Sequence, residues 1–358
     1  MSRDARTGPG RNSAPMGRTP ASARRSSAAA RAGASGAGPS PSRPRDAARL
    51  PANGLVVGVV PVGARVAGGL LVLAALAGIL ALFPTYLVVG GKELHAASGL
   101  GGFLSALIVP VAELAVGGAL LRGMLPKFGL AFAGVGGALS VGLLLIEIYR
   151  GSSSTDHPGV EVIAGQRVVT TSVDVGAGWG IGVVGLGLAV LAGAWAVAAW
   201  GRTVMDDGGA LDPVRPVLAG AAVLLGVLTV LCLTLPAADV PAQVVTNPAT
   251  GLQTVVTQEG PQALLERPGL ALLGGLLLAG AVVLCSVVAP SLRPRLATVG
   301  GLLAIAVVVL AAALSGIRDA GSRDLEWTLP GAGLLVAGLG YAGLTLVAWR
   351  ARRSGSSY

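Results

Sequence analysis

Charged residues are scarce in this sequence. They make up 12% of its 358 residues, whereas a soluble domain carries roughly 25%. Because the chain is also 53% hydrophobic, it has too little polar surface to cover a water-soluble body. In lipid this balance is acceptable, since a spanning helix satisfies its own backbone hydrogen bonds. The shortage of charge therefore excludes a soluble globular protein and favours an integral membrane protein.

Histidine and cysteine are scarcer still, with two residues of each. A protein zinc site needs three or four convergent ligands, so we interpret His95 and His157, both in polar segments, as solvated loop residues. Cys232 and Cys285 are expected near opposite membrane faces, too far apart for a disulfide. The sequence also lacks a phosphate-binding glycine loop, a nucleophile–base motif and a CxxC pair. These absences predict no metal and no cofactor.

Apolar runs long enough to cross about 30 Å of hydrocarbon recur along the chain. They cover residues 66–83, 103–121, 128–149, 177–200, 216–235, 269–289, 296–316 and 331–349. The sequence thus predicts an all-α polytopic bundle of about eight transmembrane helices. The second run is the least regular, because it contains Pro110 and Glu113. Without it, seven spans would remain and the C-terminus would lie outside.

Residues 1–54 differ from the rest of the chain. They are rich in Arg, Ser, Ala, Gly and Pro and hold ten Arg against two Asp. Such a segment cannot bury enough apolar surface to offset its ordering entropy, so we predict a disordered tail. Its charge permits contact with anionic membrane lipid and gives no reason to expect a nucleic-acid partner. A transit peptide is the alternative, but the tail is not amphipathic, and its usage is typical of GC-rich bacterial coding.

The positive-inside rule predicts the orientation. With the N-terminus inside, the inner segments carry twenty Arg and Lys residues and the outer segments carry six. We therefore predict a bacterial plasma-membrane protein with both termini cytoplasmic, together with loop 201–212 and the basic tail 350–358. Aromatic residues fall mainly at predicted span ends, as expected for interfacial rings. The exceptions, Trp195 and Tyr341, are predicted to pack between helices.

The sequence shows signs of an internal duplication. Residues 61–84 align without gaps on 213–236 with seven identities in 24 positions. Further pairs follow in the same order, namely Pro126-Lys127 with Pro294-Arg295, and Ala199-Trp200 with Ala348-Trp349. This pattern predicts two four-helix halves, 55–200 and 213–349, related by an axis along the membrane normal. The alternative is that all apolar helices of this composition look alike.

Three outer loops show the pattern of β-hairpins, with strand-forming residues on both sides of a turn. The loops are 84–102, 151–176 and 237–268, and the strands flank Gly90-Gly91, 164–166 and 247–251. The alternative is that these loops merely link helices. On the inner side, Asp206, Asp207 and Asp212 accompany Gly208-Gly209, which favours a flexible turn over a cation site.

Small residues recur every four positions in three spans, which predicts close helix packing. The ridges are Gly129, Ala133 and Gly137; Gly185, Ala189 and Gly193; and Ala271, Gly275 and Ala279.

Glu113 is the strongest candidate for a functional residue. It lies near the middle of the second span, where a carboxylate costs several kcal/mol unless it is protonated or paired. Pro110 lies one turn earlier and frees the carbonyl of Ala106. The alternative is a protonated acid that hydrogen-bonds a neighbouring helix. Glu147 and Arg150, at the outer end of the third span, have the spacing of an interfacial ion pair or of a cavity rim.

Three functional classes follow from these features. The first is a non-catalytic membrane or cell-envelope component that acts through contacts with lipid or with a membrane or envelope protein. The second is a transporter or channel for ions or small solutes, with Glu113 lining its path. The third is an intramembrane enzyme, which the spans disfavour because they offer no second catalytic group near Glu113. The sequence predicts neither the substrate nor the oligomeric state.

Overall fold

A computed structural model describes the chain from residue 55 to residue 351, with gaps. The described residues are 55–89, 91–97, 99–152, 159–163, 166–170, 173–207, 211–235, 238–239, 243–246, 253–256, 269–322 and 326–351. The predicted disordered tail, His157 and most of the predicted C-terminal tail lie outside them.

Eight helices in the described residues are long and apolar enough to cross a membrane. They are α1 (Val62–Leu80), α2 (Gly99–Leu121), α3 (Pro126–Ser152), α4 (Ala177–Trp200), α5 (Arg215–Leu233), α6 (Leu270–Ser291), α7 (Arg295–Ser322) and α8 (Leu329–Arg350). The predicted all-α polytopic fold is confirmed, including the irregular second span. The largest difference is at α7, which continues to Ser322 beyond the predicted end at 316, since polar residues can extend a helix past the apolar layer.

Proline marks several helix starts. Pro61 precedes α1, Pro126 opens α3, and Pro216 and Pro330 lie in the first turns of α5 and α8. Proline suits these positions because its φ is already helical and a first-turn N–H would have no partner within the helix. After α2, Gly123 adopts a φ of 73°, the left-handed conformation that commonly ends a helix.

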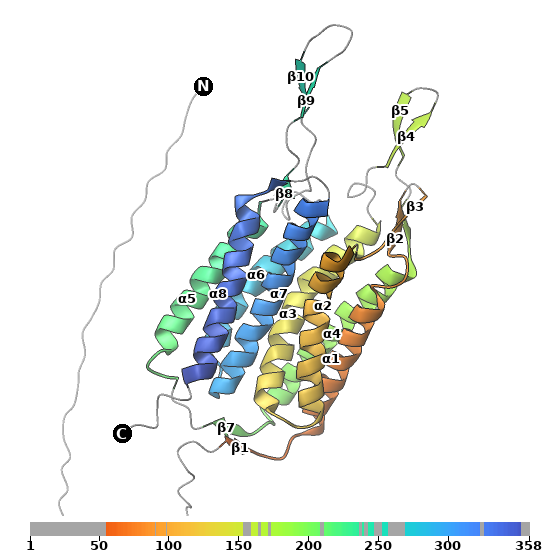
Figure 1. The fold of residues 1–358 in the computed structure, drawn as a ribbon. Coiled ribbons are helices and arrows are strands. Elements are labelled where there is room, and N and C mark those ends of the chain that lie inside the picture. Colours follow the sequence, from red (N-terminus) through yellow and green to blue (C-terminus); the bar gives the residue numbers. More distant parts are fainter. Residues whose placement is uncertain are drawn as a thin grey trace, which may run out of the picture. The chain divides into compact units, whose positions relative to one another are not determined.

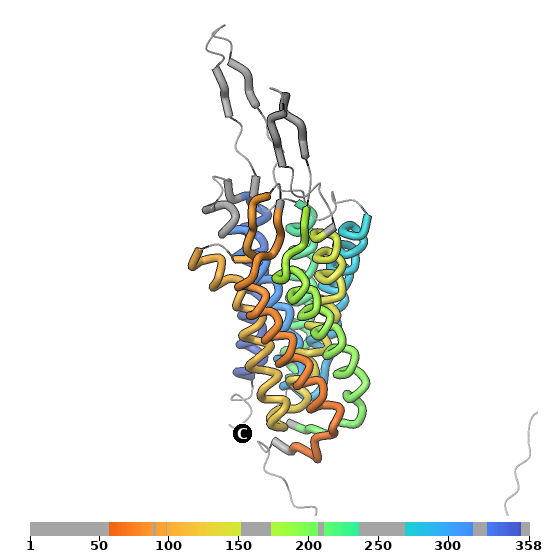
Figure 2. The backbone as a smooth tube through the Cα atoms, turned by 90° about the vertical axis from the view of Figure 1, so that its right-hand side faces the viewer, coloured from red at the N-terminus to blue at the C-terminus, as the bar shows by residue number. Residues whose placement is uncertain are grey.

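The helices pack in two similar groups. α1 packs on α2 and α4, and α3 packs on α4; likewise α5 packs on α6 and α8, and α7 packs on α8. α3 also packs on α6 and α7, and α2 packs on α7. Figure 1 shows α5 and α8 at one side, α1 and α4 at the other, and α3 and α7 between them, and Figure 2 shows the helices running along one another. α3 and α7 bury the largest share of their residues.

Small residues permit the closest helix approaches, as predicted. A Cβ atom on Gly137 would lie 2.7 Å from the Cα of Gly193, which joins the predicted ridges of α3 and α4. In α6, Ala271 and Gly275 are buried, but the closest approach is made by Gly274. A Cβ atom there would lie 2.8 Å from the carbonyl oxygen of Gly142 in α3.

Short antiparallel strands lie outside the helices. The pairs are β2 (Leu87–Val89) with β3 (Lys92–Leu94) and with β6 (Val173–Val175); β4 (Gly159–Ile163) with β5 (Gln166–Thr170); β9 (Gln243–Thr246) with β10 (Gln253–Val256); β8 (Ala238–Asp239) with β11 (Glu326–Trp327); and β1 (Leu55–Val57) with β7 (Met205–Asp207). All three predicted hairpins are confirmed. The pairs β2–β6, β8–β11 and β1–β7 were not predicted.

The two ends of the bundle are named here after their strands. The β1 end is where α1, α3, α5 and α7 begin, and the β2 end is where they finish (Figure 1). At the β1 end the predicted flexible turn is partly wrong, because Asp206 and Asp207 belong to strand β7. The prediction for Trp195 is only partly right, since its indole lies beside Gly63 of α1 but the side chain is 49% exposed on α4. Tyr341 is fully buried between helices, as predicted.

Candidate functional site

Glu113 lies on the inward-facing side of α2. Residues at helical spacing from it are buried, among them Val116, Gly117 and Leu120. Residues two positions away, Val111 and Ala115, are exposed, so the opposite side of α2 faces outward. Glu113 itself is half-buried. The carboxyl group therefore points into the bundle while keeping some accessible surface.

No hydrogen bond or ion pair joins Glu113 to any other described residue. Its oxygens are also not among the fully enclosed polar atoms, since in the described part of the chain the Nε of Arg215 is the only such atom without a hydrogen bond. Within the described chain, the carboxyl group of Glu113 therefore has no hydrogen-bond partner and is not fully enclosed.

Pro110 faces α1. It is buried, and a Cβ atom on Gly78 of α1 would lie 3.0 Å from the Cγ of Pro110. One turn further along α2, a Cβ atom on Gly117 would lie 2.9 Å from the carbonyl oxygen of Gly68. α2 is therefore pressed against α1 on both sides of Glu113 along the chain, whereas its packing on α3 is slight. This arrangement places Glu113 on the side of α2 that packs against α1.

Several other polar side chains within the helices are hydrogen-bonded. Ser105, Ser140, Thr229 and Thr345 each donate to a backbone carbonyl three or four residues earlier, at 2.7–3.0 Å. In α8 the hydroxyl of Tyr341 donates to the carbonyl of Ala222 in α5 (3.0 Å) and lies 2.6 Å from the hydroxyl of Ser286 in α6. This Tyr341–Ser286 pair ties three helices together and was not predicted. Glu113 differs from all of these side chains in having no such partner.

Glu147 and Arg150 form the predicted ion pair, with 3.5 Å between Nη1 and Oε2. The other Glu147 oxygen accepts a hydrogen bond from the hydroxyl of Tyr86, at the start of the β2 segment. Trp179, in the first turn of α4, donates its indole N–H to the carbonyl of Glu147 at 2.9 Å. Glu147 is therefore the centre of a clasp that holds the β2 segment and α4 to α3.

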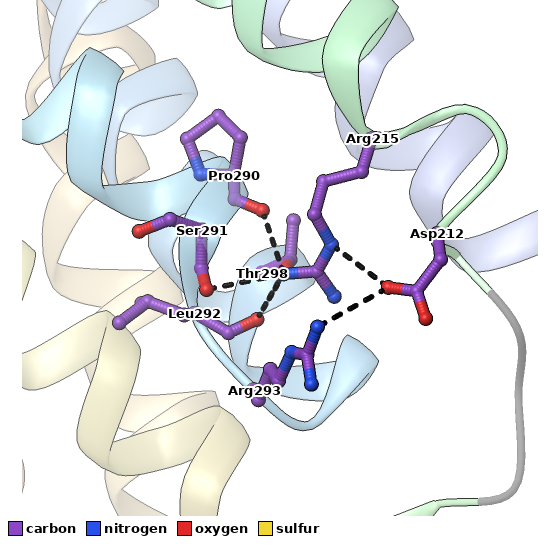
Figure 3. Close-up of polar contacts among 7 residues, drawn as sticks. All are labelled: Asp212, Arg215, Pro290, Ser291, Leu292, Arg293 and Thr298. Carbon is purple, nitrogen blue, oxygen red and sulfur yellow. Dashed lines mark hydrogen bonds and ion pairs between the residues drawn. The ribbon is translucent and has the colours of Figure 1, made fainter. Parts of the chain in front are cut away.

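At the β1 end, Arg215 makes several polar contacts at once (Figure 3). From the sequence alone, this residue is only one of the inner positive charges. Its Nη1 donates to the carbonyls of Pro290, Ser291 and Leu292 at 3.1–3.3 Å, at the end of α6. Asp212 lies 3.4 Å from its Nε and 3.6 Å from Arg293. A cation over the last carbonyls of a helix is stabilised by the helix dipole, so this cluster is a structural cap.

A second cation caps α8 at the same end. Arg295 donates from Nη1 to the carbonyls of Ala348 (3.3 Å) and Trp349 (2.9 Å). In the first group of helices, the Nζ of Lys127 lies 5.2 Å from the ring centroid of Trp200, at the end of α4. The residue pairs that suggested a duplication are therefore in contact with each other in both groups.

The remaining candidates form no site. Among the described residues, no three His, Cys, Asp or Glu side chains lie close enough to hold a metal ion. His95 is exposed, and both cysteines are free.

Comparison of the chain with protein-family models, with curated proteins and with solved structures gives no match. Its function must therefore be inferred from its own residues.

Proposed function

We propose that this multi-pass membrane protein is a non-catalytic component of a bacterial plasma membrane and presents its β2 end to a membrane or envelope protein. The observation that carries the proposal is the attachment of sheet β3-β2-β6 to the helices. Backbone hydrogen bonds join Gly176 to Tyr86 (2.9 Å) and Gly178 to Thr85 (3.0 Å), in addition to the Glu147 clasp. Ordering each loop residue costs about 1–2 kcal/mol, and a loop that only links two helices can remain unordered. The contacts that order this sheet therefore favour a role in binding.

The two edges of this sheet carry charged, exposed residues. Lys92 and Glu93 lie on β3, and Asp174 lies on β6, while Leu87 of the central strand is fully buried. Charge on an edge strand disfavours indiscriminate strand pairing and leaves side chains available for a specific polar contact. A protein partner with complementary charges fits this surface.

A crosslinking experiment tests the proposed partner. A photoreactive residue at position 92 or 174 is expected to form an adduct with one and the same protein in intact cells. Glu147→Ala should lower the yield at both positions, because it removes the carboxylate that holds Tyr86 and Arg150. Val197, which is 71% exposed on α4, is the control position for lipid contact. Adducts with lipid only, or with unrelated proteins at the two sheet positions, would refute the proposal.

The proposal places the β1 end and both termini in the cytoplasm, in accordance with the charge distribution. In intact cells, Lys92→Cys is expected to react with a membrane-impermeant maleimide. Arg293→Cys should react only after permeabilisation. The unaltered chain is the control, because Cys232 and Cys285 are buried. Labelling of Arg293→Cys from outside would reverse the orientation.

We also propose that the bundle arose by duplication of a four-helix unit, 55–200 and 213–349. Equivalent helices make equivalent contacts in the two groups, and α3 and α7 meet at the centre. The strand after the first helix pairs with the strand before the fourth helix in both, as β2–β6 and as β8–β11. When the two groups of helices are exchanged, the contact α3–α6 becomes α7–α2, and both contacts are present. This relation supports an axis along the membrane normal.

Transport of an ion or small solute is the second candidate function. It is favoured by the unpartnered carboxyl group of Glu113 inside the bundle, since intramembrane acids commonly mark ion or proton pathways.

A further inference from the structure

We propose that Glu113 is a reversible proton-binding site within the first four-helix unit. The proposal does not depend on a partner at the β2 end. It gives a specific chemistry to a residue that the contact function does not use.

The first argument is the position of the carboxyl group. Glu113 lies eight residues from the end of α2 at Leu121, on the side of the helix that packs against α1. A carboxylate at that depth is costly unless it is neutralised by a proton or a cation. A site that takes up a proton there converts the costly charged form into a neutral one.

The second argument is the surroundings of Glu113. The charged residues with described side chains on the neighbouring helices are Arg65 in α1, Lys127, Glu147 and Arg150 in α3, and Arg295 in α7. All of them lie within two turns of a helix end, as does the phenol of Tyr149, and none forms an ion pair or hydrogen bond with Glu113. Because no cation of the described chain neutralises the carboxylate, the neutralising species has to come from outside the described part of the chain, and a proton is the simplest such species.

The third argument is a contrast between the two units. α6 occupies the place of α2 in the second unit, and its inward-facing Ser286 has its hydroxyl within hydrogen-bond distance of the Val282 carbonyl and of the Tyr341 hydroxyl. α6 contains no acidic residue. In the second unit this position thus holds a hydrogen-bonded hydroxyl, whereas in the first unit it holds an acid that has no partner among the described residues and keeps accessible surface.

Dicyclohexylcarbodiimide provides the test, because this apolar reagent reacts with protonated carboxyl groups in membranes. The acid proton moves to a carbodiimide nitrogen while the carboxyl oxygen bonds to the central carbon, and the adduct rearranges to a stable N-acylurea without a leaving group. The full-length protein in lipid nanodiscs would be treated across a pH series, and each carboxyl would be examined by mass spectrometry.

We expect labelling at Glu113 that falls as pH rises and is absent in Glu113→Gln. Glu147 is the matched control within the same protein, because Tyr86 and Arg150 hold its carboxylate, and it should stay unlabelled. Absence of label at Glu113 throughout the series, or label that does not vary with pH, would overturn the proposal. Protection by sodium at constant pH would overturn it in favour of a sodium site.

The same samples separate this proposal from transport. Labelled Glu113 in a protein that carries no flux in proteoliposomes would leave the proton site intact and remove the transport function. A flux that survives Glu113→Gln, with no labelling of the unaltered protein, would remove the proton site.

Discussion

Gly142→Ala is expected to destabilise the bundle by about 1–3 kcal/mol, whereas Gly136→Ala in the same helix should leave its stability almost unchanged. A Cβ atom on Gly142 would lie 2.6 Å from both the carbonyl oxygen of Gly274 and the amide nitrogen of Leu278. These atoms belong to the backbone of α6, so they cannot rotate away as a flexible side chain could. α3 and α6 would have to separate, and this contact joins the two proposed units.

Gly136 is a stringent control, because a Cβ atom there would meet no other atom within 4 Å. Both variants add the same single methyl group to α3, so an effect of helix propensity would appear in both. The measurement is the free energy of unfolding in mixed micelles, followed by circular dichroism. Equal stability of the two variants would show that α3 and α6 do not approach as closely as the structure indicates.

The helices were predictable because their signal is local. Each span needs only its own apolar residues to be recognised, and the Pro and Gly residues at the ends of α1, α2 and α3 act within one turn. The three hairpins were predictable for the same reason, since their strands are separated by a few turn-forming residues. The pairs β2–β6 and β8–β11 were not, because two helices separate the strands of each pair in the chain.

Non-local contacts also limited prediction of the sites. The Glu147–Arg150 pair follows from three-residue spacing, but Tyr86, the other partner of Glu147, lies 61 residues away in the chain. Similarly, the spacing of Asp212 and Arg215 indicates an ion pair, whereas the carbonyls that Arg215 caps are 75 to 77 residues away. Finding them requires knowing that α5 and α6 are neighbours.

For Glu113, the depth in the membrane could be predicted from the sequence, but the direction of the side chain could not. Its distance from the span ends predicts a costly carboxylate, yet the inward side of α2 is hard to read from its sequence, because nearly every residue of the helix is apolar or small. The direction of the Glu113 side chain becomes clear only from the packing of α2 on α1 at Gly78 and Gly68. The hypothesis of a hydrogen bond from Glu113 to a neighbouring helix is not supported within the described residues.

Tyr341→Ala is expected to destabilise the second unit by about 3–5 kcal/mol, the usual cost of deleting a buried aromatic ring. Tyr341 is the largest of the fully buried side chains in the described core. The neighbouring backbone is fitted to it, since a Cβ atom on Gly226 would lie 3.2 Å from its hydroxyl oxygen and 2.6 Å from the Oγ of Ser286. Lipid cannot enter this space, so truncation of the ring leaves a cavity where α5, α6 and α8 meet.

Tyr341→Phe separates the ring from the hydroxyl. It keeps the packing and loses only the hydrogen bonds to Ala222 and Ser286, so we expect a loss of about 1 kcal/mol. Ser286 remains satisfied, because its hydroxyl can donate to the carbonyl of Val282 at 2.6 Å. Val336→Ala on the same helix is the control for a side chain that is 60% exposed, and it should change the unfolding free energy little. If Tyr341→Phe were as damaging as Tyr341→Ala, the hydrogen bonds and not the packing of the ring would hold the three helices together.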